Sequence, residues 1–465
     1  MKKLLTILLV FAVVVSSAFA GGNSETGTAE TAAPAAESHI PTGNPPAGKI
    51  HLVFWSNMSG DSLICTQNAA EAFNKAQDRY EMEVIYTSNI PTKMLTSTVE
   101  DRPNLIHSSG NDSATYIALT GADRLTVPVQ EFIDYDKYDM SNIVKNLATN
   151  YTRNGEWQCV PYGNTSTGYF YNTDILSAHG IDVESLKSYE AIYEACKKLK
   201  AEGVENPFFY RIHVDYLNYA LTAEGIEYFN NDNGKSGVPT ASYFNEGKCY
   251  EATLAFFSFI KKMALEGLLM DIEIGNTDAR NMFGNGDIAI MGGYSSGIDP
   301  TIKVTKEDVH FVFRPSPTVF AATTSAGQSP GGACIFVCDV DDPWKEYGSW
   351  EFLKFFMQDE WTCAFAMASG YVPITMTGAQ TPEYQEYIKT KNPSAQVILD
   401  MMDATPYGVG YALLPYSTDY NTAFKNIFKK MVTTPEYTAE AAAADFYKDV
   451  KEVIEMYFLS KGIVL

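Results

Sequence analysis

The stretch that decides the fold is DIAIMGGYSSG, residues 287–297. Its apolar run, 288–291, is bounded by a carboxylate and by glycines, which predicts a buried strand. Residues 292–297 follow as a turn with small residues, two hydroxyls and one aromatic ring. In α/β proteins, ligands bind beyond the carboxyl ends of strands. The stretch therefore predicts one wall of a binding crevice.

The same change from an apolar run to a polar or glycine-rich turn recurs along the chain. It follows residues 53–55 and 105–106, and it surrounds Pro161 and Gly331. Apolar runs and helical spacing alternate, which is typical of right-handed βαβ units. Strands are predicted at 50–55, 82–86, 104–107, 288–291, 311–313 and 333–337, and helices at 63–77, 92–100, 173–179, 188–201, 250–266, 279–283, 347–357, 361–369 and 435–459. We therefore expect an α/β fold whose strand ends converge on one cleft.

Composition narrows the class of ligand. The 465 residues are enough for two or three domains. The net charge of −22 argues against nucleic acid or an anionic membrane as the partner. The seven arginines are scattered, so no cluster in the sequence could grip phosphate. The 29 tyrosines combine apolar area with a hydroxyl, which suits polar ligands such as sugars.

The first 20 residues have the pattern of a secretory signal peptide. Lys2 and Lys3 precede an apolar run at 4–15, and residues 18–20 fit a small-x-small cleavage site. No cysteine stands at the cleavage point, so a lipid anchor is not expected. Residues 21–48 predict a disordered linker, with folded structure from about Lys49. We expect a protein of the periplasm or another extracytoplasmic space.

The sequence gives no sign of a cofactor or a metal site. Its seven cysteines include no CxxC, and most are expected to be small buried hydrophobes, with one disulfide left open. The six histidines are scattered without HExxH, and no P-loop or complete dinucleotide motif occurs. We expect no cofactor and no metal.

Three other classes of protein must be weighed. GYSSG at 293–297 matches the nucleophile elbow of hydrolases, but His310 is the only histidine after Ser295, with no room for the acid-bearing strand between them. A metal receptor could use Tyr169 and Tyr171, or the run 134–136. A purely structural surface protein is the third alternative.

Several pieces in a fixed order resemble one known family. They are Phe54-Trp55 before Met58-Ser59-Gly60, Ala72-Phe73-Asn74, the runs 161–166 and 169–172, the run 283–291, Gly331-Gly332-Ala333, and the run 370–375. In this order, over roughly residues 49–460, the chain resembles extracellular solute-binding proteins of ABC importers. It is similar to the sugar-binding family that includes glycerol-3-phosphate- and maltose-binding proteins.

The resemblance implies a two-lobe, type II periplasmic-binding-protein-like α/β fold with a hinged cleft between the lobes. The first lobe would hold residues 49–163 plus 305–357, and the second 164–304 plus 358–465. The implied function is capture of a sugar or small oligosaccharide and its delivery to permease subunits in the membrane. We expect no enzymatic activity, a monomer, and no binding of nucleic acid.

The resemblance also implies ligand-binding positions. Thr165 with Asn164, Ser295 with Tyr294, Gly332, Tyr371, and Asn111 or Asp112 fall where relatives contact the ligand. Aromatic faces for a sugar are offered by Trp55, Tyr216, Tyr294, Tyr407 and Tyr411.

Two departures from the family affect the ligand. Glycerol-phosphate binders have an arginine in the loop that corresponds to residues 407–411, and this chain has none there. Residues 89–91 are Asn-Ile-Pro where a tyrosine and a glutamate would be expected. We therefore expect a neutral sugar, while Arg211 leaves a sugar or polyol phosphate open as the alternative.

Overall fold

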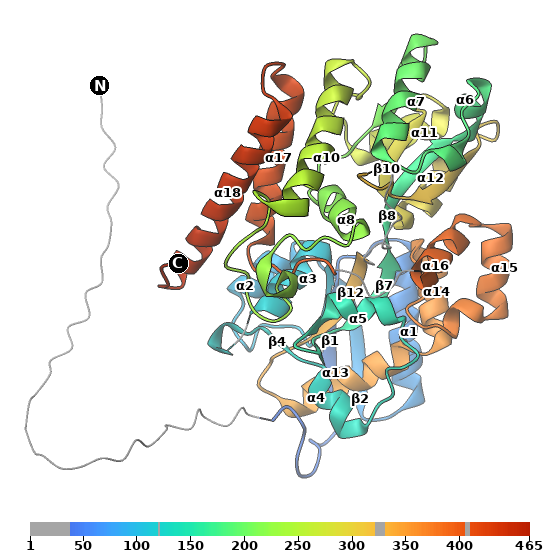
Figure 1. The fold of residues 1–465 in the computed structure, drawn as a ribbon. Coiled ribbons are helices and arrows are strands. Elements are labelled where there is room, and N and C mark those ends of the chain that lie inside the picture. The colour runs from blue at the N-terminus through green and yellow to red at the C-terminus, as the bar shows by residue number, and fades with distance from the viewer. Residues whose placement is uncertain (1–37, 120, 321–330, 405–409) are drawn as a thin grey trace, which may run out of the picture. The chain divides into compact units, whose positions relative to one another are not determined.

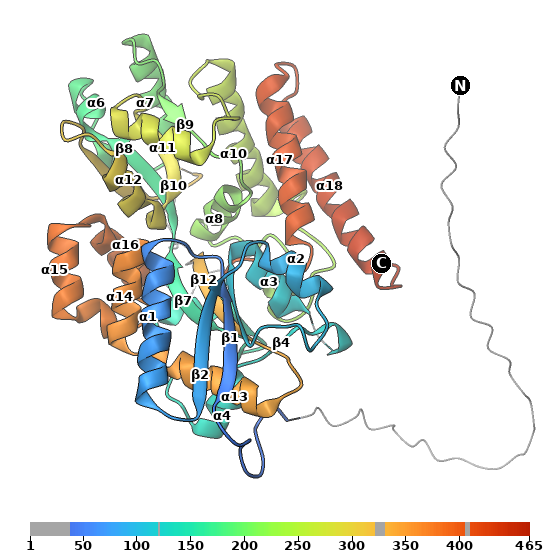
Figure 2. The same cartoon turned by 180° about the vertical axis from the view of Figure 1, so that it is seen from behind.

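The computed structural model describes residues 38–119, 121–320, 331–404 and 410–465. The expected signal peptide, most of the expected linker and Tyr407 lie outside these residues. Figures 1 and 2 show two sheets, each with its own surrounding helices.

The first sheet has six strands. Its order is β2-β1-β3-β12-β4, and β7 also pairs with β12. β1 runs parallel to β2 and β3, whereas β12 runs antiparallel to β3, β4 and β7. The strands are β1 (Ile50–Ser56), β2 (Tyr80–Tyr86), β3 (Leu105–Ser109), β4 (Thr126–Val127), β7 (Val160–Thr165) and β12 (Gly331–Cys338).

The predicted βαβ units are confirmed in this sheet. In β1, Leu52 and Phe54 are fully buried, and α1 (Asp61–Ala76) follows it before β2. The next helix, α2 (Ile90–Thr96), begins and ends earlier than the predicted 92–100. The reason is Pro91, which lies in the first turn, where its missing N–H has no helical partner to lose.

The second sheet has four strands in the order β11-β8-β10-β9. β8 pairs antiparallel with β10 and β11, and β10 runs parallel to β9. The strands are β8 (Thr167–Asn172), β9 (Phe208–Phe209), β10 (Ile290–Tyr294) and β11 (Phe311–Pro315). A separate pair is formed by β5 (Thr152–Arg153) and β6 (Glu156–Trp157).

The strand in the opening stretch is shifted from its prediction. We expected it to end at Met291, but Gly292 and Gly293 continue β10 and pair with Tyr169 and Gly168. A Cβ on Gly293 would lie 2.6 Å from the ring of Phe170, so the glycine makes room for core packing. The turn at residues 295–297 is a single 3-10 turn.

The helices contribute buried side chains to three hydrophobic cores. The first core, around the first sheet, includes α1, α2, α3 (Gly110–Ala118), α4 (Gln130–Asp136), α5 (Ala148–Tyr151), α13 (Pro343–Phe356) and part of α14 (Asp359–Ser369). The second includes α6 (Thr173–Ala178), α7 (Tyr189–Ala201), α8 (Asp215–Ala223), α10 (Gly247–Leu265), α17 (Ser417–Thr433) and α18 (Ala439–Ser460). The third includes α11 (Asn276–Asn285), α12 (Ile298–Val304), α15 (Pro382–Thr390) and α16 (Ser394–Ala404). The short α9 (Asn230–Asn233) lies between α8 and α10 along the chain.

The chain passes from the first sheet to the second through one residue. β7 ends at Thr165 and β8 begins at Thr167, so only Ser166 separates the two sheets along the chain. β11, which we expected in the first lobe, pairs with β8 in the second sheet. Its pairing places residues 311–315 with the second sheet, while the remaining lobe boundaries stay a prediction.

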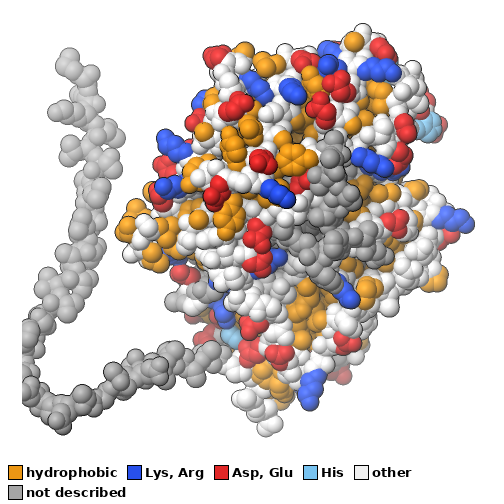
Figure 3. Space-filling model, viewed as in Figure 1, with side chains coloured by type: hydrophobic (Ala, Val, Ile, Leu, Met, Phe, Trp, Pro, Cys, Tyr) orange, Lys and Arg blue, Asp and Glu red, His pale blue; other side chains and the backbone are white. Residues whose placement is uncertain are grey.

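Folded contacts begin before the expected Lys49. The backbone N–H of His39 donates to Glu131 (3.0 Å), and Ile40 packs on the first core. All seven cysteines are buried and unpaired, as most of them were expected to be. Within the described ranges, no helix has the length and apolar content that a membrane span needs. Figure 3 shows acidic and basic side chains interspersed over one face.

Candidate functional site

A cavity of about 450 Å³ is lined by residues from both sheets and their helices. We call it the main cavity. Its walls are formed by Asp112, Ser113, Ala114, Asn150, Tyr151, Thr165, Arg211, His213, Asp215, Tyr219, Tyr294, Ser296, Gly331, Gly332, Tyr371, Tyr411, Leu413, Thr418 and Asn421. Small-molecule sites are commonly about 300–1,000 Å³, so this cavity has the size of one.

Seven of the predicted ligand-binding residues line the main cavity. They are Asp112, Thr165, Arg211, Tyr294, Gly332, Tyr371 and Tyr411. They come from positions far apart in the sequence, and the ends of β7, β10 and β12 bring several of them together. The ends of β7 and β10 and the start of β12 meet at this cavity, while ligand binding by these residues stays a prediction.

Asp112 stands in the first turn of α3, where a negative charge complements the helix dipole. Burial nevertheless raises the pKa of its carboxyl group. Its carboxylate has no hydrogen bond to another residue in the described part of the chain. A half-buried carboxylate that faces a cavity can accept hydrogen bonds from the hydroxyls of a ligand.

Asp215, at the start of α8, is already held by three neighbours. It accepts hydrogen bonds from the hydroxyls of Tyr294 (2.6 Å) and Tyr411, and it pairs with Nδ1 of His213 (3.1 Å). Burial would raise the pKa of Asp215, but the charge of His213 and these hydrogen bonds lower it below the ordinary value. This carboxylate therefore positions cavity-lining side chains.

Thr165 and Ser295 lie together rather than on opposite walls. Their hydroxyl oxygens are 2.8 Å apart, and both residues are buried. The Ser166 backbone N–H donates to Ser295 Oγ (3.1 Å), and the Ser296 N–H donates to Thr165 Oγ1 (3.1 Å). Ser295 does not line the main cavity, and its hydroxyl joins the end of β7 to the end of β10.

Three further predicted residues do not line the main cavity. Asn164 is fully buried, and its Nδ2 lies 2.8 Å from Sδ of Met402. Trp55 lies under Nζ of Lys93, 5.7 Å from the ring centroid. Tyr216 lines a second cavity, described below. Asn111 lies in the first turn of α3, and Tyr407 lies outside the described residues.

Several lining residues were missed by the sequence analysis. They include Asn150, Tyr151, Asp215, Tyr219, Ser296, Thr418 and Asn421. One signal could have found two of them, because Asp215 and Tyr219 stand four residues apart on one face of a helix that follows the predicted Arg211. The others lie in short or weakly patterned segments.

A second cavity of about 230 Å³ adjoins the main one, and we call it the arginine cavity. It is lined by Phe170, Phe209, Arg211, Tyr216, Asn276, Arg280, Met291, Gly292, Gly293, Tyr294, Ser296, Gly297 and Thr301. Arg211, Tyr294 and Ser296 line both cavities. The fold therefore places two arginines, which are far apart in the sequence, in one cavity.

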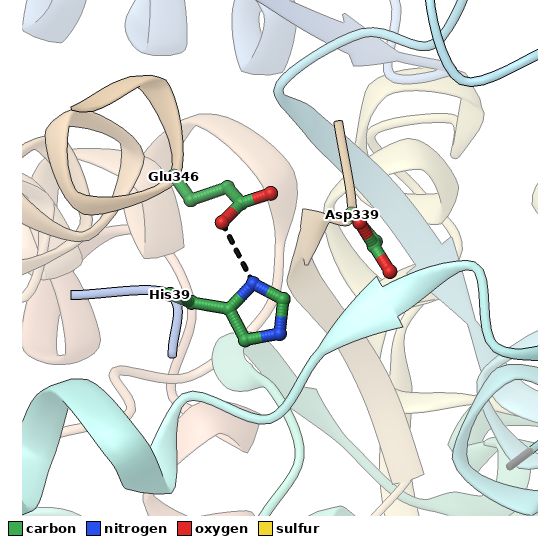
Figure 4. A group of neighbouring side chains, drawn as sticks. All are labelled: His39, Asp339 and Glu346. Carbon is green, nitrogen blue, oxygen red and sulfur yellow. Dashed lines mark hydrogen bonds and ion pairs between the residues drawn. The ribbon is translucent and has the colours of Figure 1, made fainter. Parts of the chain in front are cut away.

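One group of side chains in the described ranges has the composition of a metal site. Ligand atoms of His39, Asp339 and Glu346 lie within 4.8 Å of one another (Figure 4). However, His39 Nδ1 pairs with Glu346 Oε2 (2.8 Å), and Oε1 accepts from the Val340 backbone N–H (3.0 Å). The hydrogen bond to Glu346 raises the pKa of His39 against the opposing effect of burial. These contacts form an ion pair between His39 and Glu346 of α13.

The geometry does not support the serine hydrolase or the tyrosine-based metal receptor among the described residues. Ser295 bonds to Thr165, whereas His310 pairs with Asp174 at the surface (3.1 Å). Tyr169 and Tyr171 are buried in the second core, and neither lines the main cavity. Tyr135, in the run 134–136, is 58% exposed on α4.

The sequence matches a known family over most of its length. The family described as "Bacterial extracellular solute-binding protein" matches residues 68–392. The chain is 25% identical over 370 residues to the sn-glycerol-3-phosphate-binding periplasmic protein UgpB of Brucella melitensis, which covers 76% of this chain and 82% of that protein. It is also 25% identical over 386 residues to the protein of that name from Yersinia enterocolitica, with 78% and 83% covered.

Solved structures show the same fold at low identity. The cyclic alpha-maltosyl-1,6-maltose binding protein from Arthrobacter globiformis has a TM-score of 0.67 and 16% identity, over 88% of this chain and 99% of that one. UgpB from Mycobacterium tuberculosis, in complex with glycerophosphocholine, has a TM-score of 0.68 and 17% identity, over 90% and 100%.

These matches agree with the architecture and with the cavity at the strand ends. The chain belongs to the bacterial extracellular solute-binding proteins: it has their two-lobe type II fold, and it acts outside the cytoplasm as the component of an ABC importer that binds a small solute and delivers it to the permease.

Proposed function

We propose that the solute is a sugar or a small oligosaccharide, held in the main cavity and released unchanged. The observation that carries this proposal is the lining itself. Five tyrosines and the carboxylate of Asp112 surround about 450 Å³. The tyrosines are Tyr151, Tyr219, Tyr294, Tyr371 and Tyr411.

This combination suits the two kinds of surface that a sugar presents. Tyrosine rings can cover the C–H faces of a pyranose while their hydroxyls form hydrogen bonds. A carboxylate can accept from two adjacent sugar hydroxyls, and such charge-assisted bonds are stronger than neutral ones. Tyr219 and Tyr411 stand 5.9 Å apart between ring centroids and are tilted by 52°, so they offer two neighbouring aromatic faces.

The names of the similar proteins support this class and its alternative. One solved neighbour is a maltose-type binding protein, whereas the similar sequences are named for glycerol-3-phosphate. A sugar or polyol phosphate is favoured by one specific observation, because Arg211 lines the main cavity. The hydroxyl-bearing carbon chain is common to both kinds of ligand.

We also propose that the protein acts as a monomer, without catalysis and without nucleic acid. Proteins of this family bind their solute reversibly. The hydroxyl of Ser295 in the GYSSG motif is hydrogen-bonded to Thr165. The net charge of −22 opposes binding to phosphate backbones. A Ser295-dependent esterase activity, or a dimer in solution, would contradict these parts of the proposal.

Thermal unfolding against a panel of sugars, polyols and their phosphates tests the ligand class. A ligand at 100 times its Kd adds about 2.7 kcal/mol to the stability of the folded state. We expect a shift with at least one sugar, and we expect Asp112→Asn to weaken that binding about tenfold or more, because it removes a charged acceptor.

Asp308→Asn is the matched control, since Asp308 is exposed and lies outside both cavities. It should bind the sugar as the unaltered protein does. A panel in which no carbohydrate shifts the unfolding temperature would overturn the proposed ligand class. Equal binding by Asp112→Asn would remove Asp112 from the site.

A further inference from the structure

The arginine cavity contains a positive charge that the protein itself does not neutralise. Arg280, from α11, is half-buried, and burial lowers its pKa. It forms no ion pair with any carboxylate in the described ranges. A partly buried guanidinium without a partner is unfavourable, so a further group is needed to explain its position.

Other arginines of this protein do have partners. Arg314 pairs with Glu184 (2.7 Å), and Arg102 donates to the carbonyl of Asp339 (2.9 Å). Arg153 donates to the carbonyls of Ile117 and Ala118, both at 3.1 Å. These three arginines therefore differ from Arg280, which has no such partner among the described residues.

Arg211 brings a second guanidinium to the same cavity. With the Asn276 amide oriented so that its oxygen faces Arg211, this oxygen accepts from Nη1 (3.2 Å) and Nε (3.3 Å), which orients the guanidinium. No described carboxylate forms an ion pair with Arg211. The nearby Asp215 is engaged by Tyr294, Tyr411 and His213 instead.

A neutral group in the same wall also lacks a partner. Tyr216 is 1% exposed, and its hydroxyl forms no hydrogen bond with any described residue. A Cβ on Gly292, which lines the cavity, would lie 3.5 Å from that hydroxyl oxygen. Other buried tyrosine hydroxyls among the described residues also lack a partner, such as those of Tyr169 and Tyr210. Tyr216 differs from these two because it lines the arginine cavity, so its hydroxyl is available to a ligand there.

A residue without a side chain lies beside Arg280 in the cavity wall. A Cβ on Gly297 would lie 3.8 Å from Nη2 of Arg280, so the glycine leaves this side of the guanidinium uncovered by a side chain of its own. A cavity of about 10–15 Å³ already holds one water, so one of about 230 Å³ has room for a larger group.

We propose that the arginine cavity is a subsite for an anionic substituent, a carboxylate or a phosphate, carried by the sugar in the main cavity. Arg211 and Arg280 provide the charge, and Tyr216 donates from its hydroxyl. The two cavities share Arg211, Tyr294 and Ser296, so one ligand can occupy both. Asp112 lies only in the main cavity, so its charge repels the anion and sets the direction in which the ligand binds.

This inference rests on the proposed function for the sugar part of the ligand. It changes the expectation of a neutral sugar, which followed from the missing arginine at 407–411. The charge is supplied instead by Arg211 and by Arg280, which lie far apart in the sequence and line one cavity.

Isothermal titration of the full chain with matched probes tests the subsite. The probes are D-glucose, D-glucuronate and D-glucose 6-phosphate, the same series for galactose, and inorganic phosphate alone at constant ionic strength. We expect at least one acidic sugar to bind about tenfold or more tightly than its neutral counterpart, with affinity that falls as salt rises. The uronate and phosphate arms distinguish the two kinds of anion.

Substitutions identify the residues responsible. Arg280→Gln should reduce binding of the acidic probe about tenfold or more, because it removes charge-assisted bonds. Tyr216→Phe should reduce it several-fold while the fold is unchanged, since the hydroxyl has no hydrogen-bond partner among the described residues. Arg314→Gln is the matched control, because it removes an arginine that pairs with Glu184 outside both cavities.

The outcomes separate this inference from the proposed function. Neutral sugars that bind as tightly as acidic ones, with no effect of Arg280→Gln, would overturn the subsite and leave the proposed function standing. Binding of inorganic phosphate that depends on Arg280, with no binding of any sugar, would support the subsite and overturn the proposed function. Absence of binding by every probe would overturn both.

Discussion

His107 is a titratable side chain in the middle of the first sheet. It is 3% exposed, and neither ring nitrogen has a hydrogen-bond partner among the described residues. Its ring lies against Tyr162, with centroids 5.4 Å apart. Burial lowers its pKa to about 3, so the imidazole is neutral in the folded protein at the pH of most environments.

This pKa predicts a specific loss of stability in acid. The unfolded chain binds a proton at His107 below about pH 6.5, whereas the folded chain binds it only near pH 3. The stability that depends on a neutral His107 is therefore fully present above pH 6.5 and is lost as the pH falls toward 3. Between pH 7.5 and pH 4, the free energy of unfolding falls by about 3 kcal/mol for this reason. We expect His107→Leu to reduce the acid dependence of the free energy of unfolding by about this amount, as measured by urea unfolding.

His51→Leu is the control, because His51 is exposed on β1. It should leave the pH dependence almost unchanged. If His107→Leu loses as much stability in acid as the unaltered protein, then His107 is not the group whose protonation unfolds it.

At single positions, the sequence was informative about residue type and less so about contacts. Thr165 and Ser295 were each predicted as a ligand contact, because each is a hydroxyl at a strand end. Their mutual hydrogen bond joins residues 130 apart in the chain, and no local pattern shows it. For the same reason, the sequence singled out Arg211 but not Arg280, and it did not show that the two line one cavity.

β12 shows how one element depends on a glycine. Gly332 has φ of 128°, which side-chain-bearing residues rarely adopt, and a Cβ would lie 2.1 Å from the Gly163 carbonyl oxygen of β7. The pairing of the two strands shifts register directly afterward, between Ala333 and Cys334. The glycine therefore permits the close approach of β12 to β7 beside the main cavity.

We expect Gly332→Ala to lower the free energy of unfolding by about 2–5 kcal/mol, from backbone strain and the steric clash together. Gly297→Ala is the matched change, because its Cβ would meet no atom closer than 3.5 Å. It should alter stability by no more than about 1 kcal/mol. Chemical denaturation of both variants makes the comparison, and equal stability would mean that β12 adjusts at no cost.

Helices and strands with strong apolar patterns were predicted well. α1, α7, α10 and α18 all lie within a few residues of their predictions, because each has a continuous apolar stripe. No helix was predicted for α17, whose first turn is Ser, Thr, Asp and Tyr, which are poor helix formers. It forms because Tyr420, Phe424 and Phe428 pack into the second core.

In the whole molecule, the chain passes from the first sheet to the second beside the main cavity. Ser166 alone separates β7 from β8, and the Ser295 N–H donates to its carbonyl oxygen (2.8 Å). The connection therefore combines a covalent strand crossing with a set of buried hydrogen bonds. Hinged closure of such two-lobe proteins needs a connection that keeps its own structure while the lobes rotate.

The position of Ser295 leads to a prediction that distinguishes a role in stability from a role in ligand binding. Ser295→Ala removes the hydroxyl that bonds to Thr165 and accepts from the Ser166 N–H, so we expect a loss of about 1–3 kcal/mol in the free energy of unfolding. Because Ser295 does not line the main cavity, the Kd for the sugar should change little. Asp112→Asn should show the reverse, with weaker binding and nearly unchanged stability. Denaturation and titration of both variants test this crossed pattern. If Ser295→Ala abolished binding in a protein of full stability, the Ser295 hydroxyl would have to contact the ligand, and the sequence-based assignment of Ser295 to the binding site would be correct after all.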